Sequence, residues 1–174
     1  MIMERIYNEI KELVGNKYDF FSLLGYVFWA FNIYLSISLL SGKILGIYFF
    51  AFILFLIFIV NFVFSSITSL YIDMQSDIPL RSKEIFYFYG LSSYISFLLI
   101  PLVYLFLFTN KNLYLIFLIG FFIWILRVWF VKKKTSFGVI NSMIAVFFPH
   151  IIIFVCIFAF VLTISLISFI YLYG

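Results

Sequence analysis

Five apolar runs, each long enough to cross a bilayer, constrain this chain more than any other feature of its sequence. A helix needs about 20 apolar residues to cross the hydrocarbon core, where only helices and closed barrels satisfy their backbone groups. The chain of 174 residues is 67% hydrophobic and 10% charged, with a mean hydropathy of +1.25, which is unusual for a soluble domain. The sequence therefore predicts an all-α, polytopic membrane protein with a single membrane domain. Its five transmembrane helices are expected at approximately residues 20–40, 44–64, 86–108, 112–131 and 145–170.

The residues before the first run, 1–19, predict an amphipathic lead-in segment whose helix covers residues 1–14. Apolar side chains such as Ile6 and Ile10 recur on one side of that helix, and charged side chains occupy the rest. The pair Gly15-Asn16 predicts its end. Such an amphipathic helix lies in the membrane interface or packs on the bundle as a short solvated helix. Its mixed charges leave both interpretations open.

The third run is expected to be the packing centre, because it has the densest series of small and hydroxyl residues in the chain. Lipid tails are as apolar as leucine, so membrane helices associate through small side chains and interhelical hydrogen bonds. Pro101 removes one backbone hydrogen bond and should bend this helix. The residues expected at helix contacts along the whole chain are Gly25, Gly90, Pro101, Gly120, Ala145 and Pro149.

The last apolar run is too long for one straight crossing and contains Pro149. We interpret Gly138–Phe148 as the inner end or interfacial lead-in of a helix that crosses from about Ala145 to Ile170. Small residues recur along it at steps of three and four, which favours close helix contact. This face consists of Gly138, Ser142, Ala145, Pro149, Ile152, Cys156, Ala159 and Thr163.

Lysine and arginine are distributed unequally between the two expected membrane surfaces. With the N-terminus inside, nine of the 11 basic residues lie on the inner side, and only Lys43 and Lys111 lie outside. Cytoplasmic segments carry this excess in membrane proteins. We therefore expect a multi-pass protein of the cytoplasmic (plasma) membrane with the N-terminus inside and the C-terminus outside. Because these cations flank membrane spans, the net charge of +4 does not indicate a nucleic-acid partner.

Polar side chains within the runs concentrate in the inner half. Ionisable residues inside a membrane are functional candidates by default. Arg127, however, lies only about one and a half helical turns from Lys132, so its side chain is able to snorkel to the inner surface, and we favour that interpretation. The candidate polar cluster consists of Asn32, Asn61, Ser93, Tyr94, Arg127, Asn141 and His150.

His150 is the only histidine in the chain. Without a carboxylate or cysteine partner it makes a poor metal site and a poor general base. We favour a packing role with a hydrogen bond to a tyrosine or to a carbonyl freed by Pro149. Asn32 and Asn61 are able to line a pocket, but an asparagine in lipid more often bonds one helix to another.

The residues that carry catalytic chemistry are missing from the apolar runs. All seven carboxylates lie in the N-terminal flank or in the loop before the third run, so the runs hold no acid pair for proteolysis and no acidic proton relay. The single cysteine excludes a multi-cysteine metal site within one chain. The sequence has no H-E-x-x-H, G-x-S-x-G or P-loop motif. We therefore expect neither an enzyme nor a cofactor or metal site.

The third to fifth runs resemble the Yip-type membrane proteins, relatives of the Rab/Ypt GTPase-interacting proteins. The resemblance rests on Tyr89–Tyr94 leading to Ile100-Pro101-Leu102, on Trp124–Trp129 before a basic segment, and on Ser136-Phe137-Gly138 leading to Phe148-Pro149. It implies a non-enzymatic membrane protein that binds partners or influences membrane organisation and trafficking. The family's eukaryotic members carry a long cytosolic N-terminal region with a sequence signature that is not present here. The resemblance therefore implies a short prokaryotic member and puts GTPase binding in doubt.

Two functional hypotheses follow. The preferred one is a Yip-like protein that acts by helix-mediated interaction with lipid, with another membrane protein or with its own copies. The alternative is a small transporter, channel or lipid-binding component with a polar vestibule open to the cytoplasm. A vestibule requires Asn61, Tyr94, Arg127 and His150 to converge on a cavity, whereas a scaffold requires them to pack against other helices or face headgroups.

Overall fold

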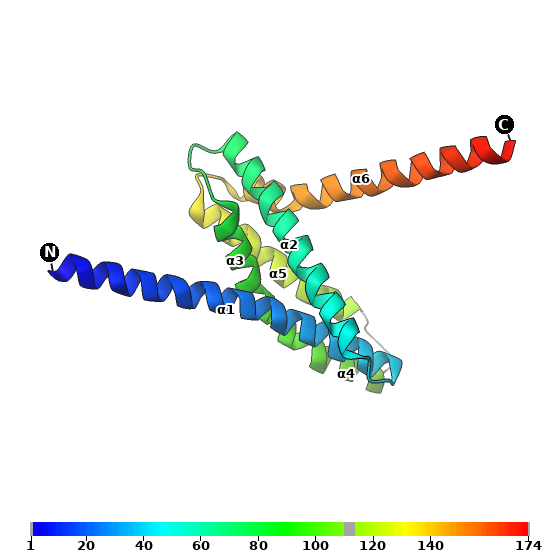
Figure 1. The fold of residues 1–174 in the computed structure, drawn as a ribbon, viewed down its shortest axis with the longest axis horizontal. Helices are drawn as coiled ribbons and strands as arrows, with labels where there is room; N and C mark the ends of the chain where they lie inside the picture. The colour runs from blue at the N-terminus through cyan, green and yellow to red at the C-terminus, as the bar shows by residue number, and fades with distance from the viewer. Residues whose placement is uncertain (1, 110–113, 174) are drawn as a thin grey trace.

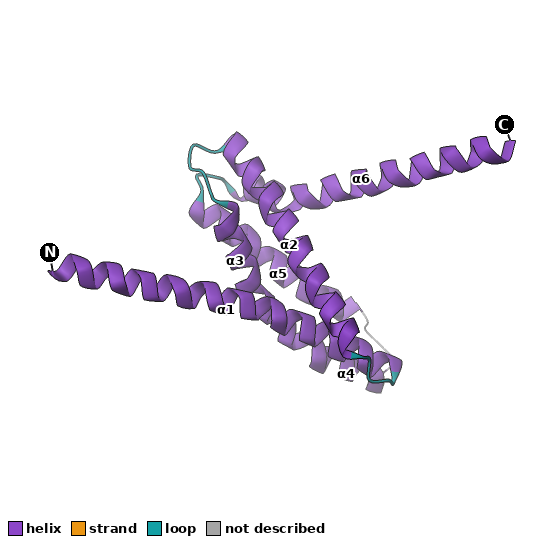
Figure 2. Cartoon of the chain, viewed as in Figure 1, coloured by secondary structure: helices purple, strands orange, loops and turns teal. Residues whose placement is uncertain are grey.

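The structure, a computed structural model, describes the backbone of residues 2–109 and 114–173 and the side chains of residues 18–108 and 117–165. The regular structure of these residues is entirely helical, as expected (Figures 1 and 2). The elements are α1 (Ile2–Ser41), α2 (Ile47–Gln75), α3 (Ser82–Ser92), the 3-10 segment η1 (Ser93–Leu98), α4 (Leu99–Thr109), α5 (Tyr114–Lys134) and α6 (Val139–Tyr173).

Four helices in the described part of the chain are long and apolar enough to cross a membrane. They cover Tyr18–Ser41, Ile47–Gln75, Ser82–Phe108 and Val139–Ser165. α5 has 21 residues but carries four basic side chains, Arg127 and Lys132, Lys133 and Lys134 in its last turn, so it is not among these four. By length and composition these four helices are consistent with a multi-pass membrane protein, and the fifth crossing stays a prediction.

α1 runs without interruption from Ile2 to Ser41, so the predicted helix end at Gly15-Asn16 is wrong. A glycine inside a helix costs only about 1 kcal/mol relative to alanine. A continuous helix also satisfies its own backbone groups as it enters the hydrocarbon. The amphipathic character of residues 1–19 stays a prediction, because nearly all of those side chains lie outside the described residues.

The third apolar run lies at the centre of the bundle, where α3 and η1 contact α1 and α5, and α3 also contacts α2. The helix changes to 3-10 geometry over Ser93–Leu98, just before Pro101. Proline lacks an N–H for the carbonyl four residues earlier and its ring crowds that turn, which favours such tightening. The hydroxyls of Ser92 and Ser93 each donate a 2.8 Å hydrogen bond to the carbonyl oxygen of Tyr89, which satisfies that carbonyl near the transition.

α1 and α3 cross in direct backbone contact at Gly25 and Gly90. A Cβ added at Gly90 would overlap the backbone carbonyl of Ser22, and one added at Gly25 would overlap the carbonyl of Gly90. The two glycines therefore allow an approach that any side chain would prevent. Beside them, the buried Tyr26 donates a 2.5 Å hydrogen bond from its hydroxyl to the carbonyl oxygen of Phe86, which also joins α1 to α3.

α6 has two halves with different surroundings. Its first half packs on α5 and α2 and buries Ser142, Ala145 and Pro149. Beyond Ile153 every described side chain, through Ser165, is exposed, and the helix runs away from the bundle (Figure 1). The helix is continuous from Val139 through Pro149, so the expected lead-in joins the expected crossing without a break.

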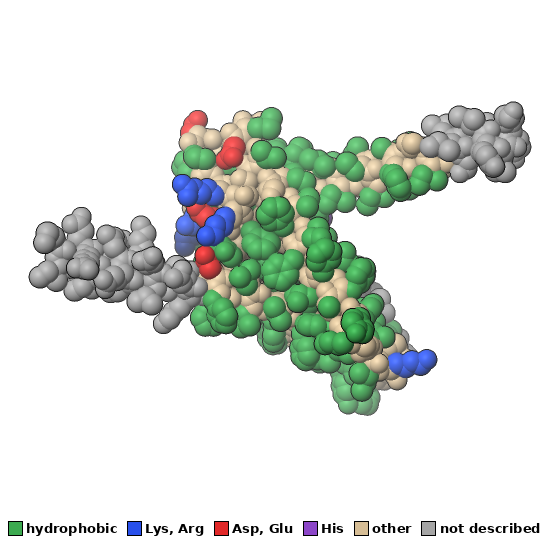
Figure 3. Space-filling view, in the orientation of Figure 1, with side chains coloured by type: hydrophobic (Ala, Val, Ile, Leu, Met, Phe, Trp, Pro, Cys, Tyr) green, Lys and Arg blue, Asp and Glu red, His purple; other side chains and the backbone are tan. Residues whose placement is uncertain are grey.

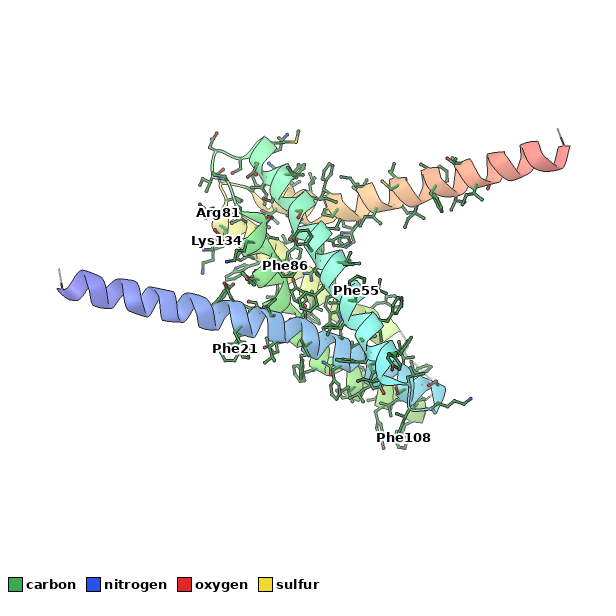
Figure 4. All side chains as sticks on the ribbon, viewed as in Figure 1. Phe21, Phe55, Arg81, Phe86, Phe108 and Lys134 are labelled. Atoms are coloured by element: carbon green, nitrogen blue, oxygen red, sulfur yellow. The ribbon has the colours of Figure 1, made fainter. Side chains whose placement is uncertain are left out.

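The surface of the bundle is mostly apolar, as a lipid-facing surface must be (Figure 3). Charged side chains gather at the end where α2 ends and α3 begins. Figure 4 shows Arg81 and Lys134 close to that end and Phe108 at the opposite one.

Candidate functional site

Arg127 is buried in the bundle and does not snorkel to the surface. Its side chain is 6% exposed. One terminal guanidinium nitrogen donates a 2.8 Å hydrogen bond to the Asn61 amide oxygen on α2, and Nε donates a 3.3 Å bond to the Ser92 hydroxyl on α3. Both acceptors are themselves buried, so these bonds are shielded from water.

Two aromatic rings complete the surroundings of the guanidinium. Its central carbon lies 3.9 Å from the ring centroid of Tyr89 and 5.9 Å from that of Trp29. A cation over an aromatic face is attracted by the ring quadrupole, by about 2 kcal/mol when the pair is desolvated. Tyr89 is held in place by a 3.3 Å hydrogen bond between its hydroxyl and that of Thr68.

No carboxylate among the described side chains forms an ion pair with Arg127. A buried charge without a counter-ion costs several kcal/mol, which neutral hydrogen bonds and two cation–π contacts offset only in part. Arg127 therefore keeps an unmatched positive charge inside the bundle. We call this arrangement of Arg127 with Asn61, Ser92, Tyr89 and Trp29 the Arg127 centre.

A cavity of about 200 Å³ opens beside the Arg127 centre. Its walls include Trp29, Asn61, Trp124, Arg127 and His150, so α1, α2, α5 and α6 all contribute. The indole N–H of Trp124 is buried and has no hydrogen-bond acceptor among the described residues. His150 is exposed on its other side and packs against Phe64 at a centroid distance of 4.4 Å.

The groups in this cavity favour an anion. Arginine supplies fixed N–H donors and no acceptor, and the indole of Trp124 is also a donor without an acceptor. A carboxylate or phosphate oxygen in the cavity would satisfy both and would neutralise the buried charge. The described residues hold no group of three or more His, Cys, Asp or Glu side chains that would bind a metal ion.

The other residues of the candidate polar cluster lie elsewhere. The buried Asn32 donates a 3.0 Å hydrogen bond from its side-chain amide to the Ser96 hydroxyl, which joins α1 to η1. Tyr94 donates a 2.8 Å bond to the carbonyl of Phe21. Asn141 is exposed near the start of α6 and does not line the cavity. Of the seven candidates, the structure thus brings only Asn61, Arg127 and His150 together.

The residues expected at helix contacts divide in a similar way. Ala145 and Pro149 are buried in the first half of α6. Pro101 and Gly120 are exposed, and a Cβ at Gly120 would meet nothing within 4 Å. Of the six predicted residues, Gly25 and Gly90 at the α1–α3 crossing and Ala145 and Pro149 near the start of α6 thus lie at helix contacts.

Sequence reasoning left three aromatic residues out of the candidate cluster, namely Trp29, Tyr89 and Trp124. A signal was available for Trp124, which precedes Arg127 by one helical turn and so lies on the same face of α5. Trp29 also lies too near the middle of its span for an interfacial anchor. No comparable signal marked Tyr89.

Comparisons of this chain with protein-family models, with curated proteins and with solved structures found no match. Its function must therefore be inferred from the geometry of its own residues.

Proposed function

We propose that this chain is a non-enzymatic, five-span protein of the cytoplasmic membrane that binds the anionic group of a ligand at the Arg127 centre. The observation that carries this proposal is the buried guanidinium of Arg127, which faces a cavity without a carboxylate partner among the described side chains. An intramembrane charge that costs stability is retained where it has a function. This is the vestibule hypothesis of the sequence analysis, with a ligand class added.

The fifth crossing is supported by where the ends of α5 lie. α3 begins and α5 ends at the charged end of the bundle, since Arg81 and Lys83 line the same groove as Lys133 and Lys134. α4 continues α3 away from that end, so α5 must run back across the bundle. The lysines at its end then lie with the other inner cations, which supports the N-terminus inside and the C-terminus outside.

The size of the cavity limits the group that enters it. A volume of about 200 Å³ accepts a carboxylate or phosphate group but not a whole lipid or nucleotide. The remaining walls include Val60, Phe64 and Ile123, which are apolar and suit a hydrocarbon continuation. The ligand class that fits best is an amphiphile with one anionic head.

Tryptophan fluorescence tests this proposal directly, because Trp29 and Trp124 line the cavity and only Trp129 lies elsewhere. The full chain with Trp129→Phe is titrated in neutral detergent with decanoate, decyl phosphate and decanol. We expect saturable emission changes with the two anions and none with decanol. Arg127→Gln should abolish the change, and Lys43→Gln, at the opposite end of the bundle, should not. Equal responses to decanol and decanoate would refute anion binding.

A second candidate is the preferred hypothesis of the sequence analysis, a Yip-like role through helix-mediated association. The observation that favours it is the second half of α6, whose described side chains beyond Ile153 are all exposed and which carries Cys156, Ala159 and Thr163 on one face. Oxidative cross-linking through Cys156 tests it in native membranes. A disulfide-linked dimer that Cys156→Ser abolishes would support association of two copies. Its absence, with no cross-linked partner, would count against this role.

A further inference from the structure

A groove lies at the charged end of the bundle, separate from the Arg127 centre. It has a volume of about 630 Å³ and is lined by residues of α1, α3 and α5 and by Arg81, which precedes α3. Four cations and two carboxylates line it, so its formal charge is +2. The cations are Arg81, Lys83, Lys133 and Lys134.

Most of this positive charge has no counter-ion in the structure. Lys83 forms an ion pair with Asp19, with Nζ 3.5 Å from a carboxylate oxygen. Among the described side chains, no carboxylate forms an ion pair with Arg81, Lys133 or Lys134. Three exposed cations from two segments far apart in the sequence thus face one groove, and Figure 4 shows Arg81 and Lys134 near each other there.

The lining changes from charged to apolar along both helices. On α3 it passes from Lys83 to Phe88 and Leu91, and on α5 from Lys134 to Phe130. Phe88 and Phe130 stack with ring centroids 4.0 Å apart and close this side of the groove. The groove is therefore charged at its rim and apolar one to two helical turns deeper.

Two aromatic residues lie at the boundary between these zones. Trp129 is 51% exposed, and Nζ of Lys133 lies 4.9 Å from its ring centroid. Tyr87 takes the same position beside Lys83, at 5.3 Å. Tryptophan and tyrosine prefer the level of the lipid headgroups in membrane proteins. The groove therefore lies where a phospholipid passes from headgroup to acyl chain.

We propose that this groove binds one acidic phospholipid, with its phosphate among Arg81, Lys133 and Lys134 and the start of an acyl chain along Leu91 and Trp129. Its positive charge complements an anionic headgroup. Its lining changes from charged to apolar with depth, as a phospholipid does from headgroup to acyl chain. A zwitterionic lipid would add a cation to a site that already has an excess of them, so phosphatidylglycerol should bind better than phosphatidylcholine. This site is independent of the anion proposed at Arg127.

Native mass spectrometry of the full chain in neutral detergent tests the proposal. The protein is incubated with equal amounts of phosphatidylglycerol and phosphatidylcholine of identical acyl chains. We expect one phosphatidylglycerol to be retained at concentrations where phosphatidylcholine is not. Lys133→Gln and Lys134→Gln should each weaken that binding about fivefold, because a cation near an anionic headgroup contributes roughly this factor.

Lys132→Gln is the matched control, since Lys132 has the same charge on the same helix turn but does not line the groove. It should leave phosphatidylglycerol binding unchanged. A loss with Lys132→Gln as large as with Lys133→Gln would show diffuse attraction and overturn the proposal. Equal retention of the two lipids would also overturn it.

Quenching of Trp129 gives a second readout in the chain with its three tryptophans intact. Phosphatidylglycerol brominated near the headgroup end of its acyl chains should quench more emission than equally brominated phosphatidylcholine. Trp129→Phe should remove that difference. A difference that persists in Trp129→Phe would place the lipid outside this groove.

Discussion

Arg127 and Lys133 lie less than two turns apart on α5, and each holds its charge beside an aromatic ring, but their surroundings differ. Arg127 is 6% exposed and donates hydrogen bonds to buried side chains of α2 and α3. Lys133 is exposed at the rim of a groove. The comparison separates a cation whose charge is held by protein groups from one that solvent and lipid headgroups reach.

The physical reason is the cost of desolvation. Water or a headgroup solvates Lys133, so its charge costs little and a mobile phosphate replaces that water easily. The charge of Arg127 has already lost its water, and the fold returns only part of that energy through Asn61, Ser92 and Tyr89. An anion should therefore gain more binding free energy at Arg127 than at Lys133, but only if it fits the cavity.

The largest expected effect on stability comes from separating α1 and α3, whose close contact helps to enclose Arg127. Gly90→Ala forces α1 and α3 apart, because its Cβ would overlap the Ser22 carbonyl. We expect a loss of about 3 kcal/mol in stability, the upper range for overpacking. Thermal unfolding in detergent measures it.

Gly120→Ala is the matched control, because a Cβ there meets nothing within 4 Å. It should leave the unfolding temperature unchanged or raise it slightly through higher helix propensity. If the two alanine variants unfolded at the same temperature, close α1–α3 contact would not be what encloses Arg127.

A smaller effect is expected from removing one acceptor of the buried charge. Asn61→Leu leaves a guanidinium N–H without its 2.8 Å partner and should cost about 2 kcal/mol. Adding Arg127→Met should recover much of that loss, because the uncompensated charge is then absent. Equilibrium unfolding of the two single variants and the double variant gives the coupling free energy between Asn61 and Arg127.

Asn32→Leu provides the neutral counterpart. It removes a 3.0 Å hydrogen bond to the Ser96 hydroxyl and leaves no charge unpaired. We expect a cost of about 0.6 kcal/mol, typical of neutral hydrogen bonds between membrane helices. Equal costs for Asn32→Leu and Asn61→Leu would contradict the view that Arg127 carries an unmatched charge.

The last two substitutions are at exposed positions and should disturb the protein least. They show on which side of the membrane the groove lies. Lys132→Cys and Lys43→Cys are introduced separately with Cys156→Ser, since both positions are exposed at opposite ends of the bundle. An impermeant thiol reagent added to intact cells should label position 43 and not position 132. The reverse pattern would put the groove on the outer surface and contradict the proposed orientation.

Hydropathy alone located most of the helices. Runs predicted at residues 20–40 and 86–108 correspond to helices over Tyr18–Ser41 and Ser82–Phe108. This works because the transfer energy of a span is a sum over neighbouring residues and does not depend on tertiary contacts. The helix end predicted at Gly15-Asn16 failed because a glycine weakens a helix without ending it.

The candidate site was far less accessible to sequence reasoning. In a membrane, both the lipid-facing and the bundle-facing sides of a helix are apolar, so hydropathy does not show which way a helix faces. Asn61 and Arg127 were expected in one inner cluster, but so were Tyr94 and Asn141, which lie elsewhere. Which of these side chains meet depends on how each helix is rotated about its axis.

Composition and local order are enough to predict a chain that is helical, apolar and charged mainly in its connecting and flanking segments. The burial of Arg127 in the bundle and the meeting of cations from two distant segments at one groove follow instead from helix packing. Both depend on how closely the helices cross and how each is rotated. Those quantities are set by packing at particular residues, as at Gly25 and Gly90.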